Sequence, residues 1–251
     1  MNLIEKFLFK VGLKLSPNLR LLKIPVSYLR YYLQRISIIG KFGRPVIIIA
    51  MPKSGSTWLE NIFMYLYNTK SVMPPQCIVY EQLNHGSHTQ RINPNLLNWC
   101  KRKSVVIKLH VSYSKSLIKW IKKTDSIFIL LHRDISEVVD SHLAYVANTP
   151  FHPDYKLTRN HKSRIQLKEN FKKEMISWIN EWEKNISSDL IISYENLLQN
   201  PKKTLEKFLN HHLEHENIQD AIEYNSLDKM KKRSPQKDFY RGSKISNHEN
   251  K

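Results

Sequence analysis

Short apolar runs alternate with stretches of helical periodicity from about residue 45 onward. The runs have the length and β-branched content of strands buried on both faces. They predict strands at Val46–Ala50, Ser104–Leu109, Ile127–Leu131 and Leu190–Ser193. Helical patterns begin at Thr57, Leu117, Ser136, Gln166 and Lys202. Because strands and helices alternate in this way when crossover helices cover a parallel sheet, the pattern predicts an α/β domain with a central parallel sheet flanked by helices.

The first 40 residues differ from this alternation. Leucines and aromatic residues recur there among basic residues, and their spacing becomes helical after Leu21. Such a stretch is typical either of a helix lying in a membrane interface or of a helical extension packed on the core. Pro17 and Pro25 interrupt the stretch and favour the packed extension. We therefore predict an N-terminal helical extension at 1–40 and the main domain at 41–251.

Composition favours one packed globule. The chain has 251 residues, of which 41% are hydrophobic, and it contains five Trp. Cys77 and Cys100 cannot form a disulfide framework or a metal cage, which favours a reducing compartment. We see neither an apolar stretch of the roughly 20 residues that span a bilayer nor a signal-peptide core. We expect a cytoplasmic protein with no transmembrane segment.

The formal net charge of +18 calls for an anionic partner or a solvated basic surface. Many of the lysines lie in helical stretches with a solvated appearance and near the C-terminus, which favours the solvated surface. The excess charge could also attract nucleic acid, an anionic membrane face or an acidic acceptor. We expect no nucleic acid partner, and peripheral contact with anionic surfaces stays open.

Pro52 ends the first apolar run and opens a small loop that is rich in hydrogen-bond donors. Backbone N–H groups, hydroxyls, an ammonium group and the positive end of a helix are all directed there at one point, and a phosphate fits such a point. The loop consists of Lys53, Ser54, Gly55, Ser56 and Thr57. Gly55 allows close approach of the backbone to a ligand, and Trp58 is placed to lie against a base. The order of residues is not that of a Walker A loop, because the lysine precedes the glycine.

Polar groups also follow two other strands of the predicted sheet. Lys108 and His110 lie at the end of one strand, and Arg133 follows another. Ligands of parallel sheets bind beyond the carboxyl ends of the strands. Arg133 and Ser141 are separated by a helix start, so that a forked guanidinium and a hydroxyl can face one shared anion.

At these residues the chain resembles the sulfotransferases that use 3′-phosphoadenosine 5′-phosphosulfate (PAPS). PKSGSTW at 52–58 is similar to PKSGTTW in that family, and the resemblance extends over roughly residues 45–245. It implies a fold related to P-loop NTPases and a transferase that moves a sulfuryl group from PAPS to a hydroxyl, or less readily an amine. It implies no metal, and adenosine 3′,5′-bisphosphate as the product.

The resemblance also implies roles for single residues. Lys53, Ser54, Gly55, Ser56, Thr57 and Trp58 correspond to the 5′-phosphosulfate loop. His110 corresponds to the base in the lysine-x-histidine pattern, and Glu81 is the competing base, because other branches use a glutamate after the first helix. Lys53 and Lys108 would stabilise charge that develops on the sulfuryl and bridging oxygens.

Arg133 and Ser141 match the family's 3′-phosphate motif, although Asp134–Ile135 stands where Asp-Pro is frequent. Tyr194 matches a tyrosine that contacts adenine. Leu227 takes the place of an aromatic residue that stacks on adenine. Arg241 and Gly242 match the final 3′-phosphate motif, but the Gly and Trp that follow it in the family are missing before Lys251.

The acceptor is a small molecule or a glycan that the sequence does not identify. The segments 76–91 and 149–164 are expected to line its entrance, the second as a loop, and we expect little regular structure at 234–251. Two alternatives remain. One is a basic polyanion-binding protein on the same fold without catalysis, and the other is a nucleotide-dependent kinase with an aberrant phosphate loop. The sequence does not indicate an oligomeric state.

Overall fold

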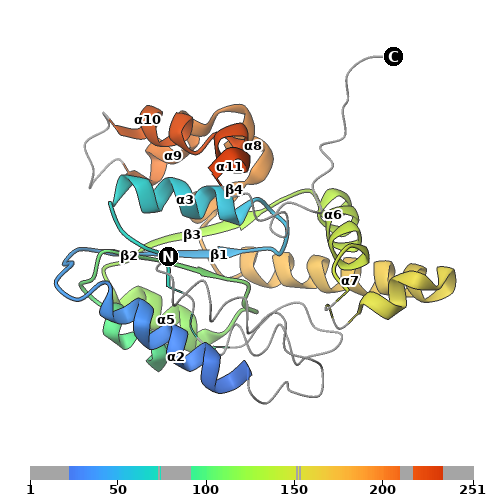
Figure 1. The fold of residues 1–251 in the computed structure, drawn as a ribbon. Helices are drawn as coiled ribbons and strands as arrows, with labels where there is room; N and C mark the ends of the chain where they lie inside the picture. Colours follow the sequence, from blue (N-terminus) through green and yellow to red (C-terminus); the bar gives the residue numbers. More distant parts are fainter. Residues whose placement is uncertain are drawn as a thin grey trace.

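A four-stranded parallel sheet lies at the centre of the computed structural model, with helices on both of its faces (Figure 1). The strands are β1 (Pro45–Ala50), β2 (Val105–Leu109), β3 (Ile127–His132) and β4 (Ile191–Ser193), in the order β2-β1-β3-β4. The structure describes residues 23–72, 74, 92–150, 152, 154–209 and 217–233. The predicted α/β fold with a flanked parallel sheet is confirmed, and the four predicted strands match within one residue at each end.

Helices connect and cover the strands. The α-helices are α2 (Lys23–Ile36), α3 (Ser56–Leu66), α5 (Lys115–Lys123), α6 (Ile135–Ala147), α7 (His161–Glu183), α8 (Tyr194–Gln199), α9 (Pro201–Leu209), α10 (Ile218–Tyr224) and α11 (Leu227–Arg233). The 3-10 helices are η2 (Pro94–Cys100), η3 (Tyr155–Arg159) and η4 (Ser188–Leu190). Among the described residues no helix combines the length and the apolar character that crossing a membrane requires.

The alternation of side chains along the strands builds two cores, one on each face of the sheet. Ile47 and Ile49 of β1 point into the core that is covered by α2, α5, α6 and α7. Val46 and Ile48 point into the other, which is covered by α3 and α8–α11. Because both faces are covered, every residue of β1 is buried, which explains the continuous apolar run in the sequence.

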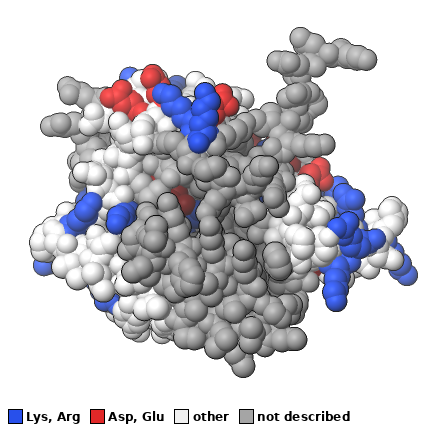
Figure 2. All heavy atoms as spheres, viewed as in Figure 1, with Lys and Arg blue, Asp and Glu red and all other residues white. Residues whose placement is uncertain are grey.

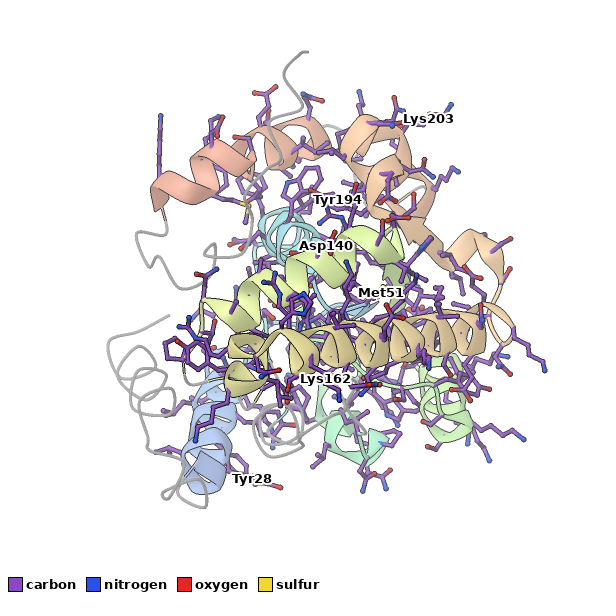
Figure 3. All side chains as sticks on the ribbon, turned by 90° about the vertical axis from the view of Figure 1, so that its right-hand side faces the viewer. Tyr28, Met51, Asp140, Lys162, Tyr194 and Lys203 are labelled. Atoms are coloured by element: carbon purple, nitrogen blue, oxygen red, sulfur yellow. The ribbon has the colours of Figure 1, made fainter. Side chains whose placement is uncertain are left out.

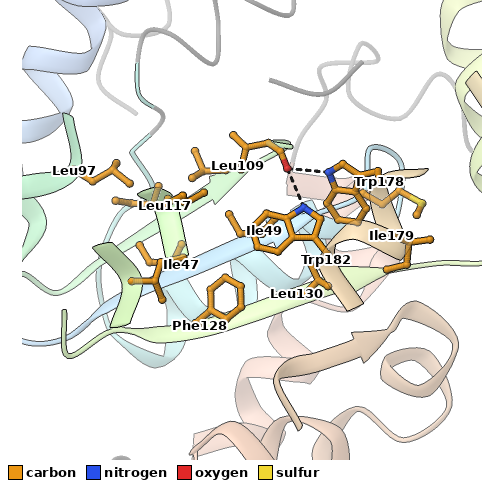
Figure 4. Close-up of a cluster of buried hydrophobic side chains, with 14 of the residues drawn as sticks. Ile47, Ile49, Leu97, Leu109, Leu117, Phe128, Leu130, Trp178, Ile179 and Trp182 are labelled. Atoms are coloured by element: carbon orange, nitrogen blue, oxygen red, sulfur yellow. Dashed lines mark hydrogen bonds between the residues drawn. The ribbon is translucent and has the colours of Figure 1, made fainter. Parts of the chain in front are cut away.

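The long helix α7 is tied to the sheet by two tryptophans. The indole N–H groups of Trp178 and Trp182 both donate to the carbonyl oxygen of Val111, at 2.8 and 3.2 Å (Figure 4). Trp182 is fully buried and packs beside Phe128 of β3. A buried carbonyl just beyond β2 thus receives two donors, and these bonds set the position of α7 relative to the end of that strand.

One face of α2 packs on the core. Tyr31 is buried and donates its hydroxyl to the carbonyl oxygen of Leu96 in η2, at 2.6 Å, and Ile38 after the helix is also buried. Pro25 lies in the first turn of α2, where a missing N–H costs little. The described part of the N-terminal stretch therefore contacts the domain. The boundary at residue 40 stays a prediction.

The segment 149–164, which was expected to be a loop, contains a 3-10 helix and the start of α7. The observed start of α7 also differs more from its predicted position than that of any other predicted helix. Residues Tyr155–Arg159 form η3, and α7 begins at His161 rather than at Gln166. The side chain of Asn160 accepts a hydrogen bond from the N–H of Ser163 and so caps α7, which begins five residues before the apolar periodicity. The other predicted starts lie within two residues of those observed.

Candidate functional site

The loop after β1 has two residues in the left-handed backbone region. Lys53 has φ 65° and Gly55 has φ 82°. This conformation costs a non-glycine residue such as Lys53 free energy in backbone strain. Strained residues of this kind are concentrated at functional sites. A Cβ atom on Gly55 would lie 2.5 Å from ring atoms of Tyr194, so the close packing of that tyrosine also requires glycine. The loop is therefore held in a shape that requires glycine at position 55.

Hydrogen bonds within the loop leave the start of α3 available to a ligand. Ser54 is buried, and its hydroxyl donates to the carbonyl oxygen of Met51 at 2.6 Å, which braces the turn. Gly55 precedes α3 and supplies no side-chain cap. The first N–H groups of the helix, at Ser56 and Thr57, thus lie at the positive end of its dipole without a capping carboxylate or hydroxyl. This arrangement suits an anion.

His110 follows β2 and is tied to the end of β1. Its Nδ1 lies 2.8 Å from the carbonyl oxygen of Ala50. Because a carbonyl oxygen can only accept, Nδ1 carries the proton in the neutral ring and Nε2 is the unprotonated nitrogen. Burial, and to a smaller extent the nearby Lys108 ammonium, lower the pKa of His110 to about 4. The ring is therefore neutral at neutral pH.

Lys108 is held by a buried carboxylate that the sequence interpretation missed. Its Nζ lies 2.6 Å from Oε2 of Glu60 and donates to Oγ1 of Thr57 at 3.2 Å. The hydroxyl of Ser71 donates to the other oxygen of Glu60. Both charged side chains are nearly buried, with 8% and 12% of their surface exposed. The only sequence signal for this pair was an acidic residue on an otherwise apolar helix face.

Arg133 lies on the other side of the loop, just after β3. Its guanidinium stacks over the ring of Tyr194, with Cζ 4.5 Å from the centroid, and Nη1 lies 3.5 Å from the carbonyl oxygen of Lys53. It also forms an ion pair with Glu137, one turn into α6, with Nε 2.8 Å from the carboxylate. Asp134 caps α6 by accepting from the N–H of Glu137, so the corner forms without the proline frequent in the family. Burial raises the pKa of Tyr194.

Lys53 and Trp58 extend the contacts of the loop to α6 and α8. The Nζ of Lys53 lies 4.8 Å from the ring centroid of Tyr145 in the last turns of α6. Trp58 is buried and meets Tyr194 edge-on at 6.5 Å, and its indole N–H has no hydrogen-bond partner among the described residues. Ser141 is half-buried on α6 between Arg133 and Tyr145 in the sequence. Figure 3 views the molecule from the side of α6 and labels Tyr194 and Met51 near that helix.

Most of the predicted site residues are thus brought together beyond the carboxyl ends of β1, β2 and β3. Those residues are Lys53, Ser54, Gly55, Ser56, Thr57, Trp58, Lys108, His110, Arg133 and Tyr194. Ser141 lies on α6, which begins two residues after Arg133. Leu227 begins α11, and its side chain is not described. Arg241, Gly242 and the competing base Glu81 lie outside the described residues. Glu60, Glu137 and Tyr145 are the residues of this region that the sequence interpretation did not assign.

The chemistry of these groups fits an anion with more than one phosphate-like end. Lys53, the first N–H groups of α3, the Ser56 and Thr57 hydroxyls and Arg133 are all hydrogen-bond donors, and Lys53 and Arg133 also supply positive charge. The buried indole N–H of Trp58 adds a donor that lacks a partner among the described residues. The aromatic ring of Tyr194, between Trp58 and Arg133, offers a surface against which a planar base can lie.

Comparisons with known proteins agree with this geometry. A family model described as a sulfotransferase domain matches residues 44–251. Among solved structures, a mouse sulfotransferase, SULT7A1 complexed with PAP, has a similar fold, with a TM-score of 0.51 and 17% sequence identity. The match covers 79% of this chain and 70% of the mouse protein. The search of curated proteins found no match.

The lowered pKa of the partly buried His110 predicts an acid-sensitive contribution to stability. The pKa of His110 is about 4 in the fold, and that of an exposed histidine is about 6.5, so the unfolded chain takes up the proton first on acidification. The contribution is complete above about pH 6.5 and is lost progressively as the pH falls toward about 4. Urea unfolding at pH 7 and pH 5 should show a larger loss of stability for the unaltered chain than for His110→Asn.

The asparagine variant is the matched comparison, because its amide can still donate to the Ala50 carbonyl oxygen without titrating. Other titrating groups are common to both proteins and cancel in the difference between them. An equal loss of stability in both proteins would show that the imidazole ring is not held in its neutral form.

Proposed function

The chain belongs to the sulfotransferase domain family, and we propose that it transfers a sulfuryl group from PAPS to a hydroxyl, or less readily an amine, of a small-molecule or glycan acceptor. The observation that carries the proposal is the meeting of the Lys53–Thr57 loop, Arg133 with Tyr194, and the Lys108–His110 pair at one edge of the sheet. These three groups are what the donor, its nucleotide part and the reaction each require.

The loop after β1 would bind the 5′-phosphosulfate. The first N–H groups of α3 and the Ser56 and Thr57 hydroxyls donate to its oxygens, and Lys53 supplies a cation. Arg133 would bind the 3′-phosphate in a forked manner, together with Ser141. The 3′-phosphate would compete with Glu137 for the guanidinium. Because the Arg133–Glu137 ion pair is partly exposed, it contributes little to stability and can be exchanged for a phosphate. Trp58 and Tyr194 would hold the adenine.

His110 would act as the general base. The acceptor oxygen attacks sulfur and passes its proton to Nε2 of His110, while the bond from sulfur to the bridging oxygen breaks and adenosine 3′,5′-bisphosphate leaves with the electron pair. The hydrogen bond to Ala50 orients the ring and keeps Nε2 unprotonated. The pKa of about 4 keeps the base free at neutral pH, and the negative charge of a bound donor raises it toward the working range.

Lys108 and Lys53 would stabilise the charge that develops on the sulfuryl and bridging oxygens. No covalent enzyme intermediate is needed, so positioning and electrostatics supply most of the rate. Lys108 can act in this way only if its ammonium group stays at the end of β2, beside Thr57 of the donor loop. Glu60 holds it there, and we assign Glu60 the role of a positioning residue.

The proposed base is tested by transfer of labelled sulfuryl from PAPS to a panel of phenols, alkyl alcohols and saccharides. His110→Asn should lower kcat by about 100- to 10,000-fold, the usual contribution of a general base, and leave the affinity for adenosine 3′,5′-bisphosphate unchanged. His161→Asn, at the exposed start of α7, is the control and should transfer normally. Unaltered turnover in His110→Asn would refute His110 as the base.

The buried ion pair predicts a distinct pattern for Glu60. Glu60→Ala should lower the free energy of unfolding by about 3–5 kcal/mol, because it leaves the Lys108 ammonium buried without its partner. Adding Lys108→Met should restore most of that stability, since no charge is then left unpaired. Urea unfolding of the single and double variants measures both effects.

The same pair is tested in catalysis by Glu60→Gln, which keeps the volume and a hydrogen-bond acceptor. With the ammonium less firmly held, kcat should fall by about 10- to 100-fold while bisphosphate affinity changes little. A fall in affinity without a fall in kcat would contradict the positioning role. Glu137→Gln is the comparison, since it loosens Arg133 without touching Lys108.

A further inference from the structure

Large apolar side chains are exposed along one side of α2 and the turn that follows it. We call this surface the α2 face, and it consists of Leu29, Tyr32, Ile36, Ile39 and Phe42. Leu29, Tyr32 and Ile36 recur at helical spacing, so they lie along one side of the helix, opposite the buried Tyr31. Ile36, Ile39 and Phe42 are 61%, 74% and 77% exposed. Single exposed apolar residues are ordinary, but a contiguous row marks an interaction surface.

A groove of about 250 Å³ runs beside this row. Its walls are apolar residues of α2, the following turn and Trp99 of η2, together with Arg35 and Lys103. The guanidinium of Arg35 lies over the rings of Tyr32 and Trp99, at 5.5 and 5.2 Å. The ammonium of Lys103 lies 4.3 Å above the ring of Phe42. Cations thus border the apolar surface directly.

The charge around the α2 face is predominantly positive, although Asp125, just after α5, pairs with Arg44 at 2.7 Å. The segments 23–44, 92–104 and 115–123 contain lysines and arginines but no aspartate or glutamate. Backbone and side-chain hydrogen bonds place these segments side by side: Ser104 N–H donates to the Lys41 carbonyl oxygen, and Trp120 of α5 donates to Asn98 of η2. Figure 1 shows α2 and α5 on the same side of the sheet, and the described atoms at the lower left of Figure 2 include Lys and Arg but no Asp or Glu.

We propose that the α2 face docks on a lipid surface that contains anionic headgroups. The aliphatic and aromatic side chains would enter the boundary between headgroups and acyl chains, and the bordering cations would contact lipid phosphates and carboxylates. Arg35 and Lys103 line the groove, Lys41 lies in the turn after α2, and Lys101 and Arg102 directly precede Lys103. The helix lies on the surface rather than across it, since it is amphipathic and its other side is buried in the protein.

The apolar and charged components together favour lipid over other anionic partners. A nucleic acid or a sulfated glycan could pair with the cations, but neither would bury the exposed Ile36 and Ile39, because aliphatic side chains cannot stack on bases. A second copy of this chain would cover the apolar row. In a two-fold dimer, however, the same basic surface would meet itself, and like charges would repel across the contact. An anionic bilayer complements both the apolar and the charged residues.

The test is flotation of the full chain with vesicles of phosphatidylcholine alone and of phosphatidylcholine mixed with phosphatidylserine. The unaltered protein should bind the mixed vesicles, bind neutral vesicles far more weakly, and lose binding as salt is raised. Ile36→Ser with Ile39→Ser should weaken binding by about tenfold or more through lost apolar burial. Neutralising Lys101, Arg102 and Lys103 to glutamine should weaken it by about 100-fold or more.

Matched controls come from α7, which carries exposed residues of both kinds. Ile165→Ser with Ile176→Ser removes exposed apolar residues there, and Lys172→Gln with Lys173→Gln removes exposed charge. Both control variants should bind the mixed vesicles like the unaltered chain. The proposal is independent of catalysis, so nucleotide binding and sulfuryl transfer should be unchanged in all variants.

Three results would overturn the proposal. The first is no binding to mixed vesicles, or equal weakening by the α7 controls. The second is vesicle binding that depends on the lysines but not on Ile36 and Ile39, which would indicate a site for soluble polyanions. The third is a chain that is dimeric in solution and becomes monomeric in the Ile36→Ser, Ile39→Ser variant, which would assign the α2 face to a second copy.

Discussion

The parallel pairing of β1 with β2 on one side and β3 on the other determines where the loop after β1, His110 and Arg133 lie. The register pairs Ile49 with both Leu109 and Leu130, so the three strands end together. Hydrogen bonds continue past the ends of the strands. The Ala50 carbonyl oxygen accepts from Nδ1 of His110, and the Met51 N–H donates to the Leu131 carbonyl oxygen. The loop after β1 is thus anchored to both neighbouring strands, and those same neighbours carry His110 and Arg133, the proposed base and the proposed 3′-phosphate ligand.

Carboxylates hold the cations of the site in place. Glu60 fixes Lys108 from within the fold, whereas Glu137 holds Arg133 at an exposed corner. A buried pair keeps its geometry because separating the charges is costly, and an exposed pair exchanges partners easily. Lys108 is therefore held in advance for its proposed catalytic role, whereas Arg133 can change partners when a phosphate binds. His110, the proposed base, completes the arrangement as a neutral ring near Lys108 and Lys53.

The sequence predicted the sheet, the donor loop and the strand-end residues because each of these depends on local patterns. Five buried apolar residues in a row indicate an interior strand, and a lysine–serine–glycine turn before a helix indicates an anion site. Glu60 was missed because its role depends on a contact with Lys108, 48 residues away, that no local pattern reveals. The start of α7 was misplaced because the Asn160 cap, and not the apolar periodicity, begins the helix. The exposed side of α2 could not be told from its buried side until the packing of Tyr31 was known.

The central claim is that the loop at the end of β1 and Arg133 together form a site for a nucleotide with phosphates at both its 5′ and 3′ positions. Calorimetric titration with adenosine 3′,5′-bisphosphate tests it most directly, with adenosine 5′-monophosphate as the comparison and Arg133→Ala as the matched variant. The account predicts micromolar binding of the bisphosphate, much weaker binding of the monophosphate, and loss of that difference in Arg133→Ala. Equal affinity for both nucleotides in the unaltered chain, or no binding of either by the folded protein, would contradict it.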